Sequence, residues 1–178
     1  KDKEYKTHGA KINQKLKHCR KAHKHESYLC TMLEQFLNHI HEHGLCAPQD
    51  RVLLAVSGGL DSMVMLDLFA KAGFNFGVAH CNFQLRGNDS DDDERFVWEK
   101  AGALQVPFFI TRFNTKAFAD ERGISTQMAA RDLRYAWFDE LLNSEGYNFM
   151  ATAHHANDAI ETSLLNWIKG SLFISGIP

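Results

Sequence analysis

The chain has 178 residues, of which 44% are hydrophobic, and its mean hydropathy is −0.33. This composition provides for one domain with a sizeable core, and because no run of about 18 apolar residues occurs, no membrane span is expected. The four cysteines form no C-x-x-C pair, so we expect free thiols in a reducing cytoplasm rather than a disulfide or zinc fold.

The formal net charge of −2 is unevenly spread along the chain. Residues 1–25 hold nine Lys and Arg against two acidic residues, a local charge of +7, so the remainder carries −9. A basic arm can grip an RNA backbone, but a solvated tail ahead of a native start at Met32 explains the same pattern. We therefore expect a basic arm over residues 1–31, which is either a native RNA-binding segment or a tail that is non-native or disordered, and one domain over residues 32–178.

The first predicted elements are a helix and a buried strand. Apolar residues recur at helical spacing from about residue 32 to residue 43, and Gly44 and Pro48 then supply turn chemistry. Residues 51–56 read Arg-Val-Leu-Leu-Ala-Val. A β-branched and aliphatic run of this length is typical of a buried strand in a parallel sheet.

A polar loop, residues 57–62, joins this strand to a helix predicted over residues 61–72 and reads Ser-Gly-Gly-Leu-Asp-Ser. Its two glycines let the backbone turn sharply and approach a ligand with no Cβ in the way. The helix N-terminus offers N–H groups and the positive end of the helix dipole, and Ser57 and Ser62 add hydroxyl donors. The loop is therefore predicted to hold phosphate, although it matches neither the Walker pattern nor the dinucleotide G-x-G-x-x-G pattern.

Strands and helices continue to alternate along the chain. We predict strands over residues 74–80, 108–111 and 148–153, and helices over about 90–104, 126–143 and 156–169. Such alternation implies parallel βαβ units, so the predicted fold class is α/β, with a doubly wound, mostly parallel sheet and helices on both faces.

Three polar segments follow predicted strands: residues 57–62, 80–86 and 154–161. Ligands of doubly wound sheets bind beyond the carboxyl ends of the strands. The convergence of the three segments at that edge predicts a ligand site there.

The Ser-Gly-Gly-x-Asp-Ser loop resembles the pyrophosphate loop of N-type ATP pyrophosphatases, which cleave ATP between the α- and β-phosphates. Three further segments resemble the tRNA(Ile)-lysidine synthetase family in particular. They are residues 80–87 with the acidic helix start 89–94, residues 127–135 and residues 153–162. With the loop, they follow family order across residues 32–178, so the resemblance implies the PP-loop catalytic domain of that family there.

The resemblance implies a cytoplasmic ligase that uses ATP. The C2 oxygen of the wobble cytidine of isoleucine tRNA with a CAU anticodon is adenylated, pyrophosphate leaves, and free L-lysine attacks C2 with release of AMP. ATP and Mg²⁺ are the expected cofactors, and this tRNA and lysine are the expected partners, with no membrane involved. We expect this sequence to hold the catalytic domain without the C-terminal tRNA-binding domains of the family, and the glycine-poor segment 170–175 is consistent with a missing loop.

The resemblance also assigns site residues. Catalytic roles fall to Arg134, Asp158, Glu161 and Asp61, and the last of these is also a possible Mg²⁺ ligand. Substrate binding falls to His154 and Asp158. The residues assigned to ATP binding are Ser57, Gly58, Gly59, Leu60, Asp61, Ser62, His80, Arg86 and Arg131.

Several of these residues have a structural explanation as well. Arg131 and Arg134, three residues apart on one helix face, are also explained as solvated side chains or as partners of Asp132 and Glu140. Acidic residues such as Asp158 and Glu161 are favoured in the first turn of a helix by the dipole alone, and His154 also suits the polar end of a strand.

Three alternative functions remain open on the sequence. A tRNA thiolase with the same loop routes sulfur through cysteines or an iron–sulfur cluster, and the missing C-x-x-C counts against it. Another ATP-pyrophosphatase synthetase that adenylates a small substrate does not explain the segments at 85–87 and 129–135. A non-catalytic ATP-sensing module needs neither the arginines nor the paired acids.

Overall fold

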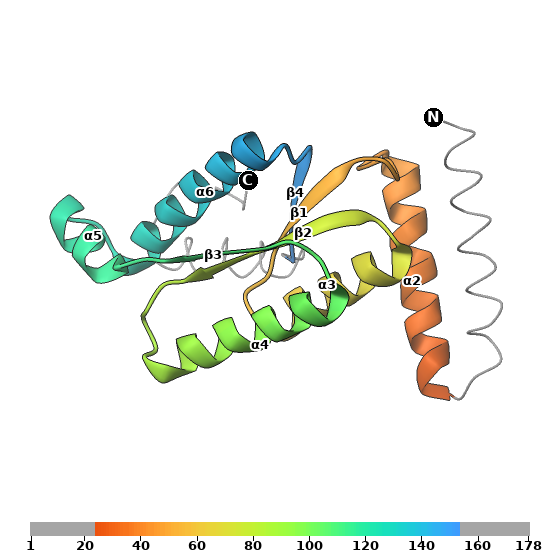
Figure 1. Ribbon diagram of the computed structural model, residues 1–178, viewed down its shortest axis with the longest axis horizontal. Coiled ribbons are helices and arrows are strands. Elements are labelled where there is room, and N and C mark those ends of the chain that lie inside the picture. The colour runs from red at the N-terminus through yellow and green to blue at the C-terminus, as the bar shows by residue number, and fades with distance from the viewer. Residues whose placement is uncertain (1–23, 154–178) are drawn as a thin grey trace, which may run out of the picture.

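The computed structural model describes the backbone of residues 24–153 and the side chains of residues 31–153. Four parallel strands form one sheet in the order β3-β2-β1-β4 (Figure 1). They are β1 (Arg51–Ala55), β2 (Asn75–Asn82), β3 (Phe108–Arg112) and β4 (Phe149–Thr152). The chain runs outward from β1 to β3 and then returns to the other side of β1. The strand order therefore reverses between β1 and β4, which is the place where such sheets bind ligands.

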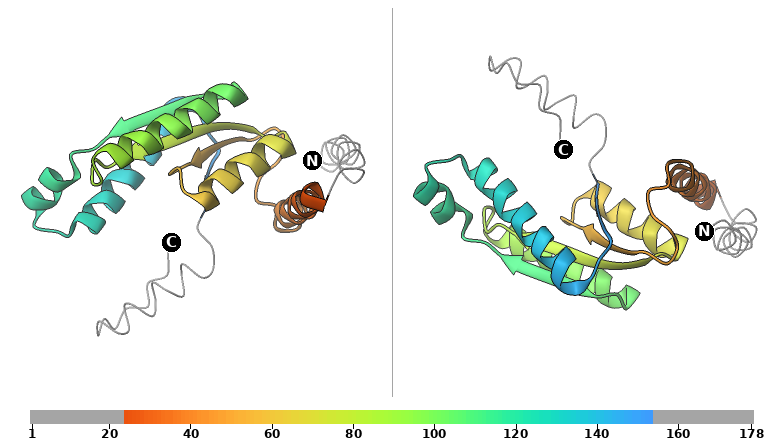
Figure 2. Two further views of the ribbon diagram at one scale, coloured as in Figure 1. Left: turned by 90° about the horizontal axis from the view of Figure 1, so that it is seen from below. Right: turned by 90° about the horizontal axis from the view of Figure 1, so that it is seen from above.

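Helices cover both faces of the sheet, because alternate side chains of each strand point to opposite faces and both sets are apolar. Val52 and Leu54 of β1 pack with buried residues of α2 (Lys24–His43), α3 (Leu60–Ala72) and α4 (Asn88–Leu104). Leu53 packs on the opposite face with Phe138 of α6 (Thr126–Glu145). In Figure 1, α6 lies above the strands and α4 below them, and Figure 2 shows the same layers from two other sides. The predicted α/β fold is confirmed.

Within the described residues the predicted boundaries agree with the structure to within two residues except at the start of α2, and one short helix was not predicted. The helix predicted over residues 156–169 lies outside the described residues. Helix α2 begins at Lys24, eight residues before the predicted helix. Strand β2 extends to Asn82, so His80 lies inside the strand rather than at its end. The short helix α5 (Thr115–Arg122) was not predicted, since its polar sequence shows little apolar periodicity; Asn114 caps it by accepting a hydrogen bond from the N–H of Ala117.

No helix in the described part of the chain is long and apolar enough to cross a membrane.

The carboxyl ends of β1, β2 and β4 all reach one edge of the sheet, because the three strands are parallel and in register. The segments that follow β1 and β2 therefore meet in space, as the sequence predicts, and the predicted segment 154–161 after β4 lies outside the described residues.

Candidate active site

A pocket of about 310 Å³ lies at this edge of the sheet, where the strand order reverses. The volume is at the lower end of the range for small-molecule sites. Strands β1, β2 and β4, the loop 57–62 and helix α6 all contribute to it. The residues that line it are Ala55, Val56, Ser57, Gly59, Leu60, Asp61, Ser62, Ala79, Cys81, Phe83, Arg134, Phe138, Thr152 and Ala153.

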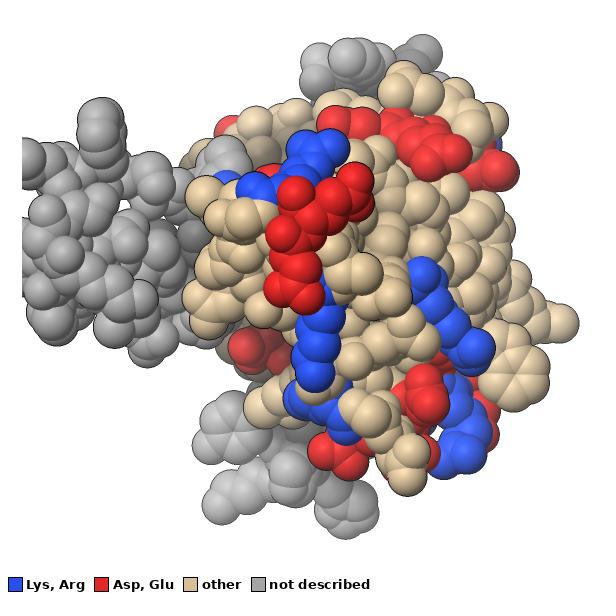
Figure 3. Space-filling view, turned by 90° about the vertical axis from the view of Figure 1, so that its left-hand side faces the viewer, with Lys and Arg blue, Asp and Glu red and all other residues tan. Residues whose placement is uncertain are grey.

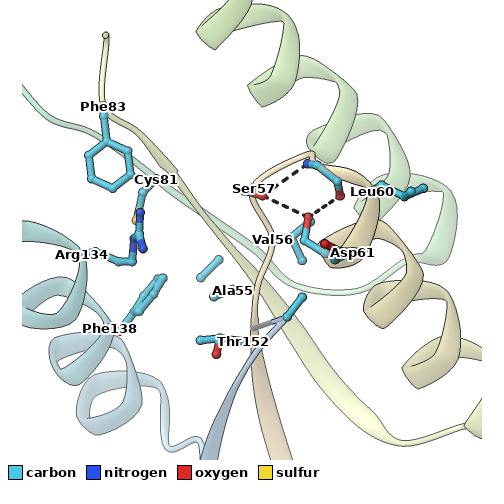
Figure 4. Close-up of a pocket in the computed structure, with 14 residues that line it drawn as sticks. Ala55, Val56, Ser57, Leu60, Asp61, Cys81, Phe83, Arg134, Phe138 and Thr152 are labelled. Atoms are coloured by element: carbon cyan, nitrogen blue, oxygen red, sulfur yellow. Dashed lines mark hydrogen bonds between the residues drawn. The ribbon is translucent and has the colours of Figure 1, made fainter. Parts of the chain in front are cut away.

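Hydrogen bonds within the 57–62 loop hold it in shape (Figure 4). The Oγ of Ser57 accepts from the N–H of Gly59 at 3.3 Å and shares a hydrogen bond with the Oγ of Ser62 at 3.2 Å. Ser62 donates to the carbonyl of Gly59 at 2.8 Å and is buried. The two hydroxyls therefore shape the loop from inside, and Ser57, the exposed one, borders the pocket.

The loop ends at the N-terminus of α3, whose N-cap is Gly59. Glycine has no side chain, and no side-chain cap bonds to the first turn of α3. Gly59, Leu60, Asp61 and Ser62 line the pocket, so the positive end of the α3 dipole lies at its wall. This arrangement suits an anion such as a phosphate. The side chain of Leu60 points away from the pocket, so its contribution is the backbone (Figure 4).

Gly58 gives the loop a turn that other residues rarely make. Its φ is +91°, in the left-handed region that favours glycine, and an added Cβ would stand 3.3 Å from the Cβ of Asp93. Asp93 belongs to α4 and forms an ion pair with Arg86. The start of α4 is therefore packed against the loop, and Arg86 is held next to that contact rather than in the lining of the pocket.

The opposite wall of the pocket is aromatic and carries a cation. Figure 4 shows Arg134, Phe83 and Phe138 on the side of the pocket opposite Ser57 and Asp61. The guanidinium carbon of Arg134 lies 5.1 Å from the centre of the Phe83 ring. Phe138, one turn later on α6, is buried beside it. A half-buried guanidinium thus faces a helix N-terminus across a small pocket, and both favour negative charge between them.

Comparison with known proteins identifies the loop and its surroundings. A family model described as a PP-loop domain matches residues 26–177. The chain belongs to the PP-loop domain family. The 57–62 loop is accordingly the PP-loop. The match to the family covers all described elements from α2 to β4, apart from the first two residues of α2.

Curated relatives with the name tRNA(Ile)-lysidine synthase are similar to most of this chain. The protein from Bacteroides thetaiotaomicron is 42% identical over 138 residues, which are 78% of this chain and 32% of that protein. The protein from Chlorobaculum tepidum is 44% identical over 148 residues, 81% of this chain and 44% of that protein. The protein from Porphyromonas gingivalis is 45% identical over 139 residues, 78% of this chain and 30% of that protein. The chain thus spans less than half the length of each of these relatives.

His80 supports the PP-loop from below instead of lining the pocket. It is 2% exposed, and its Nδ1 donates to the carbonyl of Val56 at 2.8 Å, directly before the loop. Strand alternation explains this position, because Ala79 and Cys81 face the pocket and His80 faces the other side of the sheet. A contact between His80 and nucleotide remains a prediction, and the observed contact is with the backbone that carries the loop.

Cys81 lines the pocket but is not a nucleophile at neutral pH. Burial raises the pKa of the Cys81 thiol to about 12, and the nearby Arg134 charge offsets this only in part. A thiol with this pKa is almost entirely protonated at pH 7, and the thiolate is the form that attacks or binds metal. Cys81 therefore contributes to the shape of the pocket rather than to covalent chemistry.

A polar network anchors the turn between β2 and α4. Asn82 is 1% exposed, and its amide donates to Asp91 at 2.9 Å and to Glu94 at 2.8 Å. Glu94 also accepts two hydrogen bonds from Arg112 at the end of β3. Acidic and basic side chains lie next to one another on this side of the molecule (Figure 3). The acidic run 89–94 therefore acts as helix-start charge with structural partners, as the sequence favours.

Glu94 should make the stability of the domain sensitive to acid. The hydrogen bond from Arg112 holds the pKa of the Glu94 carboxyl below its ordinary value of 4.5. The stabilisation is therefore complete above the ordinary value and is lost as the pH falls through the lower, folded-state pKa. We expect Glu94→Gln to lower the free energy of unfolding by roughly 1 kcal/mol at pH 7 and to flatten its decline on acidification. Urea titrations between pH 7 and pH 3 measure both effects.

The matched control is Glu99→Gln, an exposed position on the same helix. It should leave the acid dependence of stability as it is in the wild type. An equally steep acid decline in Glu94→Gln would show that the Glu94–Arg112 pair does not contribute to it.

The structure brings together only some of the predicted site residues. Ser57, Gly59, Leu60, Asp61, Ser62 and Arg134 line one pocket, with Gly58 inside the loop beside them. Arg131 is exposed, and its guanidinium carbon lies 5.4 Å from the centre of the Tyr135 ring, outside the pocket lining. The predicted residues that lie outside the described part of the chain are His154, Asp158 and Glu161.

Sequence reasoning did not assign eight of the residues that line the pocket, and three of these are Cys81, Phe83 and Phe138 on the wall opposite the loop. The signal was present in the periodicity of each element. Cys81 and Phe83 are two and four residues after Ala79, at the end of β2 and directly beyond it, and Phe138 is four residues after Arg134 on α6.

Proposed function

We propose that this chain is the catalytic part of an enzyme that ligates lysine to C2 of the wobble cytidine of isoleucine tRNA with a CAU anticodon. One observation carries the proposal: the PP-loop and Arg134 face each other across a single pocket at the strand-order reversal. The curated relatives with the name tRNA(Ile)-lysidine synthase support the choice of substrate.

The proposed reaction has two steps. In the first, the C2 oxygen of the cytidine attacks the α-phosphorus of ATP, the bond between the α- and β-phosphates breaks, and pyrophosphate leaves. In the second, the ε-amine of lysine attacks C2 and loses a proton, and the C2–oxygen bond breaks to release AMP. Both departing groups are anions, so positioned donors and charge supply most of the rate.

The residues of the pocket suit the first step. We assign the pyrophosphate end of ATP to the PP-loop and the α3 N-terminus, which favour anions by N–H groups and dipole. We assign Arg134 to the charge that develops at the α-phosphate, because a guanidinium binds phosphate oxygens in pairs. Arg86 and Arg131 remain proposed ATP contacts, and His154, Asp158 and Glu161 remain the proposed groups that bind and deprotonate lysine.

The chemistry of the pocket is also compatible with Mg²⁺. No group of three or more His, Cys, Asp or Glu side chains gathers as a metal site among the described residues. Mg²⁺ in nucleotide enzymes is commonly held by substrate phosphates, water and only one or two carboxylates, and Asp61 lines the pocket at the phosphate end. Bound there, Mg²⁺ would neutralise charge on the phosphate oxygens.

Pyrophosphate release separates this proposal from the alternatives. We expect the full chain to release pyrophosphate and AMP from ATP when CAU-anticodon tRNA and lysine are both present. Release that requires a sulfur donor in place of lysine would identify a thiolase, although the protonated Cys81 does not favour one. Release with a small substrate and no tRNA would identify another synthetase, and ATP binding without any release would identify a sensor.

A further inference from the structure

Arg134 differs from the three arginines that contact α4 in what holds it. Arg86, Arg95 and Arg112 each form an ion pair with a carboxylate of α4. The Arg134 guanidinium instead lies over the face of the Phe83 ring, 5.1 Å from its centre. A cation over an aromatic face is attracted to the ring while its N–H edges stay available for hydrogen bonds.

The Phe83 ring is fixed independently of any ligand. The carbonyl of Phe83 accepts a hydrogen bond of 2.9 Å from the hydroxyl of Thr115, which is 1% exposed. The ring stacks on Phe113 with 5.7 Å between the ring centres and 24° between the planes. The carbonyl of the preceding Asn82 accepts from the N–H of Phe113 at 2.9 Å. Three contacts with the segment after β3 therefore hold Phe83 in place.

The turn after Phe83 is fixed as well. Gln84 adopts a φ of +53°, which is uncommon for a residue other than glycine. The side-chain oxygen of Asn82 accepts from the N–H of Gln84 at 3.0 Å, and its amide is bonded to α4. The strained turn is thus maintained by a buried side chain with partners on both sides. Its effect is that Phe83 remains at the pocket wall.

We infer that Phe83 is a positioning residue, whose ring holds the Arg134 guanidinium at the pocket wall opposite the PP-loop before ATP binds. A flexible arginine loses side-chain entropy when it is ordered on a ligand, and a preformed contact reduces that loss. The inference rests on the proposed function only in that the anion Arg134 meets is a phosphate of ATP.

A double-mutant cycle tests the inference with two readouts, the affinity for ATP and the kcat for pyrophosphate release. We expect Phe83→Leu to weaken ATP binding about threefold to tenfold and to lower kcat by at least as much, from the usual strength of a cation–π contact. Phe83→Tyr retains the ring face and should behave like the wild type. In the Arg134→Ala background, Phe83→Leu should cause no further loss, because its effect passes through the arginine.

The matched control is Phe118→Leu, which removes a similar contact with Arg122, at 4.7 Å, outside the pocket lining. It should leave both readouts unchanged. Equal losses from Phe83→Leu with and without Arg134 would overturn the inference, and so would an unchanged affinity and kcat. If Phe83→Leu does not fold, as judged by thermal unfolding, Phe83→Met enters the same cycle.

The affinity readout also separates the inference from the proposed function. Suppose that the double-mutant cycle shows coupling between Phe83 and Arg134 in ATP affinity, but the wild type releases no pyrophosphate with tRNA and lysine. The proposed reaction would then be refuted, and the positioning role of Phe83 would stand. Pyrophosphate release by the wild type, without coupling between Phe83 and Arg134 in ATP affinity, would support the reaction and refute the positioning role.

Discussion

Arg134→Ala is expected to lower the rate of pyrophosphate release by about 10²–10³-fold, the usual cost of removing one donor to charge that develops in a transition state. The guanidinium lines the pocket opposite the PP-loop, where an α-phosphate would lie between it and the α3 N-terminus. The Arg134 charge stabilises the transition state more than bound ATP, because negative charge develops as the bond between the α- and β-phosphates breaks. We therefore expect kcat to fall more than the affinity for ATP. Single-turnover measurements of pyrophosphate release provide the rate.

Arg122→Ala is the matched control for this variant. Arg122 also lies over an aromatic ring, that of Phe118, but outside the residues that line the pocket. Its removal should leave the rate within about twofold of the wild type. A similar rate for Arg134→Ala and the wild type would remove Arg134 from the chemistry and leave it a wall residue.

Gly58→Ala is expected to weaken ATP binding by at least about tenfold, because two costs fall on the same residue. The φ of +91° is unfavourable for alanine by roughly 1–2 kcal/mol, and the new methyl group would stand 3.3 Å from Asp93. The PP-loop backbone must move to relieve the unfavourable φ or the close contact with Asp93. N–H groups that bind phosphate tolerate little displacement. Equilibrium titration with ATP measures the loss.

Gly123→Ala separates the loop geometry from general strain. Gly123 ends α5 with a φ of +63°, and an added Cβ there would meet nothing within 4 Å. Gly123→Ala should lower the free energy of unfolding by an amount similar to Gly58→Ala. It should bind ATP as tightly as the wild type does. If Gly58→Ala also bound ATP normally, the loop would not be the phosphate site.

The α/β fold could be predicted because its determinants are local. A strand buried on both faces needs an apolar run, and residues 51–56 show one; a helix that starts at a ligand loop needs glycines and polar residues, and residues 57–62 supply them. Helix α5 was missed because eight residues with a polar composition give no clear period, and its cap at Asn114 is a weak signal alone.

The candidate site was predicted only in part, for reasons that His80 and Phe83 illustrate. His80 belongs to a segment that resembles a family motif, but β2 continues two residues beyond it, and the His80 side chain contacts the backbone of Val56. Phe83 belongs to the same segment and reaches the pocket instead. Alternation along a strand decides which side chains face the site, and how far the strand continues is hard to predict from sequence.

By itself, the sequence determined the succession of strands and helices, the phosphate-binding character of residues 57–62 and the resemblance that names a reaction, because each depends on neighbours in the chain. Only the tertiary structure decided that β4 lies beside β1, that Arg131 lies outside the pocket that Arg134 lines, and that Phe83 holds Arg134 there. The pairing of β4 with β1 joins residues 97 apart in sequence, such as Val52 and Phe149, and the contact between Phe83 and Arg134 joins residues 51 apart. The packing of α6 against the sheet brings Arg134 to the pocket, and no local pattern shows which helix face such packing selects.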